Sequence, residues 1–324
     1  MKKIFNPILL SALTLLSVSC NQQGKSTAND SKNSGTKDHG TISISGAFAL
    51  YPITVKWAEE FKKLHPGVKI DVSAGGAGKG VTDVLSGLTD IGLLSRDLTP
   101  EEKDKGGFPI AVTKDAVVPD ISVNNPYLKE LQTKGVTKEE LNDLFITGKI
   151  DKWNQLGVSG NSPVHIYTRS DASGAAETWA KYFGKKQEDL KGTAVFGDPG
   201  LAQAVQKDPL GIGFNNIVYV YDSKTNKPTN GVVPLPVDLN SNGKIDADEN
   251  FYSSVDEIDS AIAAGKYPSP PARNLYFLTK GTPTSNLVKE FIKFVLTDGQ
   301  QYIKPAGYIA LPKDSVSTSL SKLK

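Results

Sequence analysis

Residues 41–94 decide the fold and read TISISGAFALYPITVKWAEEFKKLHPGVKIDVSAGGAGKGVTDVLSGLTDIGLL. Short runs rich in Ile and Val predict three strands, and apolar residues at helical spacing predict two helices between them. The expected elements are strands at 41–44, 68–72 and 91–94 and helices at 52–64 and 81–88. A repeated order of strand, loop and helix is typical of a parallel sheet with helices on its faces. The stretch therefore predicts an α/β fold.

The rest of the chain continues this order. We expect helices at 137–145, 175–183 and 286–296 and strands at 164–167, 211–221 and 274–278. A chain of 324 residues is long enough to form two cores, which predicts two lobes. The last strand and helix are predicted to return to the first lobe. The predicted organisation is lobe 1 at 41–124 and 274–324, with lobe 2 inserted at 125–273.

Composition excludes two classes of function. The chain has 37 Lys and Arg against 35 Asp and Glu, a net charge of +2 without any basic block, which argues against nucleic acid as a partner. His39, His65 and His165 are far apart in the sequence and no Cys or Glu accompanies them at zinc-site spacing. We therefore expect a binding protein rather than an enzyme.

The first twenty residues predict export. Lys2 and Lys3 precede an apolar stretch at 4–16, which is typical of a signal peptide and too short to span a membrane. Cys20, the only cysteine, follows small residues as in a bacterial lipoprotein lipobox, which it resembles except for Ser17 where Leu is usual. Residues 1–20 are thus a predicted lipoprotein signal, with Cys20 lipid-anchored to a bacterial membrane on its periplasmic or cell-surface side. The alternative is simple secretion.

Residues 21–40 contain almost no apolar side chains and cannot bury enough surface to fold, so they are predicted to be a disordered tether.

Three junctions between a loop and a helix, at 46–51, 75–80 and 173–175, can direct free amides and a positive helix end at an anion. Gly78-Lys79 partly matches the phosphate loop of nucleotide hydrolases. That match fails because Ser73 stands where the first glycine belongs and Gly80 where Ser or Thr is required. A tight turn that packs a helix on a sheet is the other interpretation of the glycine-rich junction.

Arg169 is the strongest single candidate for anion binding. Its guanidinium offers a planar fork to an oxyanion, and Asp171 is placed to hold it. The alternative interpretation of Arg169 is a surface ion pair.

Several segments together resemble one family. RSDASG at 169–174 resembles the Arg-x-Asp-x-Ser-Gly-Thr signature of bacterial phosphate-binding proteins that serve the high-affinity ABC importer. DIGLLSR at 90–96, GKIDKW at 148–153 and GIGF at 211–214 are similar to further elements of that family. The resemblance covers nearly the whole chain after residue 40.

The resemblance implies a two-lobed periplasmic-binding-protein fold, each lobe a mainly parallel sheet flanked by helices, with the ligand cleft between the lobes. It implies a working monomer that captures phosphate for an ABC importer permease. Carried over by position, the anion-binding residues are Leu50, Tyr51, Ala77, Ser173, Gly174 and Ala175 through their amides, Arg169 and Ser173 through their side chains, and Ser95 and Arg96 in the loop after the third strand.

The chain departs from this family at the positions that choose the ligand. Ala47 or Leu50, Ala77 and Ala175 stand where the family commonly supplies hydroxyls, and Ser95 stands where many members have a carboxylate. Each lost hydrogen bond to a charged group costs about 1.5–3 kcal/mol if nothing replaces it. Another tetrahedral oxyanion therefore remains an alternative ligand.

Lys79 and Arg96 are candidates to restore the lost attraction, and Asp97 is a candidate proton acceptor. A surface interaction lipoprotein and a phosphatase remain the alternatives from other functional classes.

Residues 238–249 (DLNSNGKIDADE) match the EF-hand loop, with Gly243 at its sharp turn. The predicted calcium ligands are Asp238, Asn240, Asn242, the carbonyl of Lys244, Asp246 through water, and Glu249 with both oxygens. Only three of these are ionised, which predicts modest affinity and a structural role. Pro234 and Pro236 replace the usual entering helix, and a polar turn without metal is the alternative.

Overall fold

The computed structural model describes residues 39–324. The predictions for the signal peptide, for Cys20 and for nearly all of the tether lie outside these residues.

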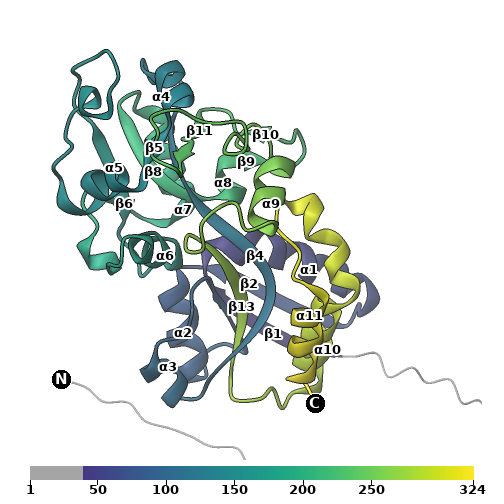
Figure 1. Ribbon diagram of the computed structural model, residues 1–324. Coiled ribbons are helices and arrows are strands. Elements are labelled where there is room, and N and C mark those ends of the chain that lie inside the picture. The colour runs from purple at the N-terminus through teal and green to yellow at the C-terminus, as the bar shows by residue number, and fades with distance from the viewer. Residues whose placement is uncertain (1–38) are drawn as a thin grey trace, which may run out of the picture. The chain divides into compact units, whose positions relative to one another are not determined.

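One mixed sheet runs through the molecule in the order β2-β1-β3-β13-β4-β8-β6-β7, with β11 paired to β4 (Figure 1). Its strands are β1 (Gly40–Gly46), β2 (Val68–Ala74), β3 (Ile91–Leu94), β4 (Gly107–Ser122), β6 (His165–Arg169), β7 (Thr193–Val195), β8 (Gly211–Asn216), β11 (Val232–Pro234) and β13 (Ala272–Lys280). Strand β1 is parallel to β2 and β3, and β6 is parallel to β7 and β8. Strands β4 and β13 run antiparallel to each other and to the strands that flank them. Two short pairs complete the strands: β5 (Val136–Thr137) with β12 (Val237–Asp238), and β9 (Tyr221–Asp222) with β10 (Lys227–Pro228).

Helices cover the sheet. They are α1 (Tyr51–Leu64), α2 (Ala77–Ser86), α3 (Pro100–Asp104), α4 (Leu128–Lys134), α5 (Lys138–Asn142), α6 (Gly174–Tyr182), α7 (Gly197–Lys207), α8 (Ile217–Val220), α9 (Val255–Ala263), α10 (Asn286–Leu296) and α11 (Lys313–Ser321). Short 3-10 turns lie at Phe48–Leu50, Trp153–Leu156, Gln187–Asp189, Asp298–Tyr302 and Lys304–Ala306, and a π turn at Asp143–Thr147. Within residues 39–324 none of the helices combines the length and the apolar character needed to cross a membrane.

Two large apolar cores define two lobes, and β4 contributes to both. Ile110 of β4 packs into the first core, which lies among β1, β3, β13, α1 and α10. Ile121 of the same strand packs into the second core, where Trp179 stacks on Phe214 with ring centroids 5.7 Å apart. A smaller cluster around α8 and α9 takes Val118 from the middle of β4. The expected two-lobed periplasmic-binding fold is therefore confirmed.

Several predicted elements agree closely with the structure, and two do not. Helix α10 has the predicted bounds, and α1 begins one residue early. Helix α2 begins at Ala77 and not at residue 81, because the glycine-rich stretch is partly helical. A β-carbon at Gly80 would lie 2.8 Å from the Leu93 carbonyl oxygen, so glycine lets α2 pack directly on β3. The strand expected at 211–221 ends at Asn216, where α8 follows.

Asp259 in α9 generates a prediction about pH and stability. Its side chain is 8% exposed, and neither carboxylate oxygen has a hydrogen-bond partner within the described chain. Burial raises the pKa of Asp259 to about 7, so its favourable contribution is complete below the unfolded pKa and is lost as pH rises toward 7. We expect Asp259→Asn to increase the free energy of unfolding at pH 8 by roughly 1–3 kcal/mol, and by much less near pH 4.

Urea unfolding of both proteins at the two pH values measures this difference. An equal effect at pH 4 and pH 8 would contradict the assignment of a raised pKa to Asp259.

Candidate functional site

The N-terminal ends of α2 and α6 converge between the lobes. The amide of Gly78, in the first turn of α2, donates a 3.0 Å hydrogen bond to the carbonyl of Ala172, which lies in the loop before α6. A β-carbon at Gly78 would lie 2.5 Å from the Ala172 β-carbon, so only glycine permits this approach. On the other side, the Ser95 hydroxyl lies directly against Gly174, the first residue of α6.

Three of the predicted amides have no hydrogen-bond acceptor within residues 39–324: those of Ala77, Gly174 and Ala175. They belong to the first turns of two helices, whose positive ends attract anions. The structure thus brings these three amides and the Ser95 hydroxyl together at one junction, and all four residues are buried.

The other predicted amides are engaged within the chain. The amide of Leu50 donates to Ala47 at 3.2 Å, and that of Tyr51 donates to Phe48. The amide of Ser173 donates to Oε1 of Gln187 at 2.9 Å, and its hydroxyl oxygen accepts from the amide of Ala176 at 3.2 Å. Ser173 is therefore the N-cap of α6, and its hydroxyl proton remains available to a ligand.

Arg169 lies at the end of β6 with a side chain that is 1% exposed, so the surface ion pair considered for it is wrong. Its Nε and Nη2 donate to the Asp171 carboxylate at 2.9 and 2.7 Å, and its Nη1 donates to Asp198 at 2.6 Å. The Phe48 ring covers the guanidinium, with its centroid 5.5 Å away. Burial opposes the charge, but Asp198 and Asp171 outweigh it and raise the pKa of Arg169.

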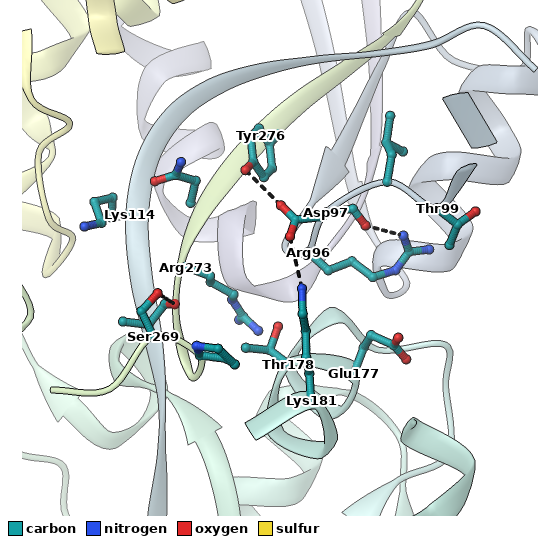
Figure 2. A pocket seen from close by; sticks show the side chains of 14 residues that line it. Arg96, Asp97, Thr99, Lys114, Glu177, Thr178, Lys181, Ser269, Arg273 and Tyr276 are labelled. Atoms are coloured by element: carbon teal, nitrogen blue, oxygen red, sulfur yellow. Dashed lines mark hydrogen bonds and ion pairs between the residues drawn. The ribbon is translucent and has the colours of Figure 1, made fainter. Parts of the chain in front are cut away.

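Arg96 faces the space between the lobes but is held by its own lobe. Its guanidinium makes two 2.7 Å hydrogen bonds to Glu102. It lines two interlobe cavities, of about 660 and 450 Å³, the second of which also contains Arg169 and Ser173. Figure 2 shows the larger cavity, with Lys181 of α6 directed across it at Asp97.

The two further charged candidates lie elsewhere. Asp97 is exposed and accepts from Lys181 at 3.2 Å and from the hydroxyl of Tyr276 at 3.1 Å. Lys79 forms an ion pair with Asp83 on its own helix. Both charged groups are therefore paired with other side chains, Asp97 across the cavity of Figure 2 and Lys79 along α2.

Sequence patterns missed four polar residues that surround Arg169 and Gly174. Asp198 opens α7, Asn216 ends β8, and Asp115 and Arg273 face each other on β4 and β13. All four are buried. Burial raises the pKa of Asp115 to about 7, although Arg273 lies 3.5 Å away. None of them belongs to a motif, so no signal in the sequence identifies them.

The loop at 238–249 is wound around two buried carboxylates. Asp238 accepts from the amides of Asn242 and Gly243 at 3.3 and 2.8 Å. Glu249 accepts from the amides of Leu239, Asn240 and Asp246 at 2.9, 3.1 and 3.1 Å. Across residues 39–324, no three His, Cys, Asp or Glu side chains are grouped as metal ligands.

Two lobes that share β4, with helix N-termini converging between them, define a solute-binding protein of the periplasmic-binding class. The comparisons agree with this class: a family model described as a PBP superfamily domain matches residues 31–299. The chain belongs to this family.

Its relatives include proteins named for phosphate. The phosphate-binding protein PstS of Bacillus subtilis is 27% identical over 311 residues, covering 95% of this chain and 93% of the relative. PstS of Staphylococcus epidermidis is 26% identical and covers 93% of this chain and 88% of the relative.

A solved structure agrees in fold and sequence. A putative phosphate ABC transporter substrate-binding protein from Clostridium perfringens, with bound phosphate, has a TM-score of 0.69 and 26% identity. It covers 84% of this chain and 100% of its own. An ABC-type phosphate transport receptor from Vibrio cholerae, 22% identical with a TM-score of 0.61, shares the fold and covers 84% of this chain and 100% of its own.

Proposed function

We propose that the chain binds inorganic phosphate between its lobes and delivers it to the permease of an ABC importer. The observation that carries this proposal is the convergence of free amides from α2 and α6 beside Ser95. Relatives named for phosphate, and a similar structure with bound phosphate, support the same ligand.

The chemistry of the junction suits a tetrahedral oxyanion. Two helix ends supply partial positive charge, and amides donate to oxygen without moving. Arg169 uses three of its five N–H groups on Asp171 and Asp198, which leaves two for an anion. Because Ala77 and Ala175 carry no hydroxyl, the anion gains fewer bonds than in a hydroxyl-rich site, and another tetrahedral oxyanion is the alternative ligand.

The same groups favour binding over catalysis. The residues that converge offer amides, a hydroxyl and a guanidinium, and within residues 39–324 no base is paired with the Ser95 hydroxyl as a nucleophile requires. A phosphatase would release phosphate from a chromogenic ester, and a surface interaction module would show the same stability with every oxyanion.

The predicted ligand binding is tested by calorimetric titration of residues 39–324, stripped of anions, with phosphate and then with sulfate. We expect submicromolar phosphate binding and no heat with sulfate. Ser95→Ala removes one hydrogen bond to a charged ligand and should weaken phosphate roughly ten- to hundredfold.

Ser86→Ala is the matched control, because its hydroxyl bonds the Asp83 carbonyl at the far end of α2. An unchanged affinity in Ser95→Ala would remove Ser95 from the site, and no phosphate binding by the unmodified protein would reject the proposed ligand.

We also propose that residues 238–249 bind one calcium ion in a structural role. The loop's side-chain oxygens include amides of Asn240 and Asn242 as well as carboxylates, and Gly243 has the positive φ of 82° that the sharp turn needs. Asp238 and Glu249 would hold the ion between them, and their present amide bonds would be exchanged for it in part.

Thermal unfolding of residues 39–324 with calcium and with EDTA tests this second site. Calcium at about 100 times its Kd should stabilise the fold by about 2.7 kcal/mol, and Glu249→Gln should abolish that gain. Glu188→Gln, on an exposed 3-10 turn, is the control. Equal unfolding temperatures with calcium and with EDTA would exclude the site.

We propose, finally, that the protein is an extracytoplasmic lipoprotein anchored through Cys20. The proposal is supported by the signal pattern before Cys20 and by the polar composition of residues 21–40. Expressed in a bacterium with its signal, the protein should sediment with membranes, and Cys20→Ser should move it to the soluble exported fraction. Membrane association that survives the substitution would exclude lipidation.

A further inference from the structure

Arg273 sits at the centre of a buried polar network next to the proposed site. It lies near the start of β13, is 9% exposed, and its guanidinium reaches toward α6 (Figure 2). Its Nη1 donates a 2.7 Å hydrogen bond to the carbonyl of Gly174, the first residue of α6. Its Nη2 donates to Oδ1 of Asn216 and lies 3.5 Å from Asp115. One side chain therefore joins β13, α6, β8 and β4.

A second branch of the network leads from Arg273 to Arg169. The Asn216 side chain accepts from Arg273 through its oxygen and donates to Oδ1 of Asp198 through its nitrogen. The other Asp198 oxygen accepts from Nη1 of Arg169 at 2.6 Å. Arg273 thus contacts the helix end directly and the anion-facing arginine through two intermediates.

The network is attached to the paired strands β13 and β4. Arg273 and Asp115 are register partners in the β13–β4 ladder, and that ladder continues to Lys280. Burial of a guanidinium is costly unless its donors find acceptors. Both Nη groups of Arg273 have acceptors, while its Nε has none within residues 39–324, so the Nη partners are what holds the side chain in position. The planar fork can donate to three acceptors in different directions, which a lysine ammonium on a flexible chain does not reproduce.

We propose that Arg273 is a positioning residue of the oxyanion site. It does not touch the anion; it holds the first turn of α6 and, through Asn216 and Asp198, the guanidinium of Arg169 in the places that bind the ligand. The inference rests on the proposed phosphate binding and names a residue on which that binding depends.

The test compares phosphate affinity with stability in four variants. Arg273→Met and Arg273→Lys should each weaken phosphate binding at least tenfold, because neither side chain holds Gly174 and Asn216 together. Asn216→Ala cuts only the branch to Arg169 and should give a smaller loss. If the Arg273 variants do not fold, Asn216→Ala still tests the inference.

Thr113→Val is the matched control. Thr113 is buried on the same strand as Asp115, and its hydroxyl donates to the Ile309 carbonyl at 2.8 Å, away from the network. Loss of the Thr113 hydroxyl should lower the free energy of unfolding and leave phosphate affinity unchanged. A general loss of stability would instead weaken binding in Thr113→Val and Arg273→Lys alike.

Amide resonances of Gly174 and Ala175 in nuclear magnetic resonance spectra separate positioning from stability. At saturating phosphate, Thr113→Val should keep the wild-type shifts of these amides, and Arg273→Lys should not. Wild-type affinity and wild-type shifts in Arg273→Lys would overturn the inference, as would equal affinity losses in Arg273→Lys and Thr113→Val.

If the unmodified protein binds no phosphate, the proposed function is rejected without rejecting the role of Arg273. That role is then tested by spectra of the protein without ligand. In that case Arg273→Lys and Asn216→Ala must shift the Arg169 Nε–H signal and Thr113→Val must not; unshifted signals in the first two reject the inference.

Discussion

The backbone pairing of β4 is the constraint on which the structure depends. This single strand of 16 residues contributes side chains to both lobe cores. Strand β13 pairs with it antiparallel from Gly107 to Ala116, with one register shift between Leu275 and Tyr276. Hydrogen-bonded ladders tolerate little sliding, because a shift by one residue exchanges the two faces of the sheet. The lobes are therefore held in a register that points the ends of α2 and α6 at the same place, although the two helices belong to different cores.

The charges at this place are paired with one another within the chain. Arg169 has two carboxylate partners. The Nη groups of Arg273 face a carbonyl, an amide oxygen and Asp115, whereas its buried Nε has no hydrogen-bond partner within residues 39–324. The arrangement limits the attraction. Asp115, Asp171 and Asp198 outnumber the two arginines, and burial raises the pKa of Asp115 to about 7, which reduces the excess of negative charge near neutral pH.

The sequence predicts well those helices and strands that depend on residues close together in the chain. The periodicity of 286–296 gives α10 with its true bounds, and the strand predicted at 164–167 and the helix predicted at 175–183 correspond to β6 and α6. The start of α2 is missed because glycine is a poor helix former, and only packing of Gly80 on β3 makes its place in a helix favourable. Arg273 and Asp198 are missed for a different reason: Arg273 meets Gly174 across 99 residues of sequence, and no local pattern encodes such a contact. The site residues themselves, and the calcium loop, remain predictions until ligands are measured.

The absence of hydroxyls at Ala77 and Ala175 removes only part of the hydrogen-bonding capacity of these positions. Backbone amides are present whatever the side chain, so these replacements remove some donors and leave the helix ends in place. Helix ends of this kind can therefore persist at about 26% identity, the level between this chain and the structure from Clostridium perfringens. Selectivity does depend on side chains. A backbone amide always donates, whereas a side chain at a given position can supply either a donor or an acceptor. If the proposed site is correct, the identity of the anion depends on Ser95, Ser173 and the acids around Arg169, which the buried network holds.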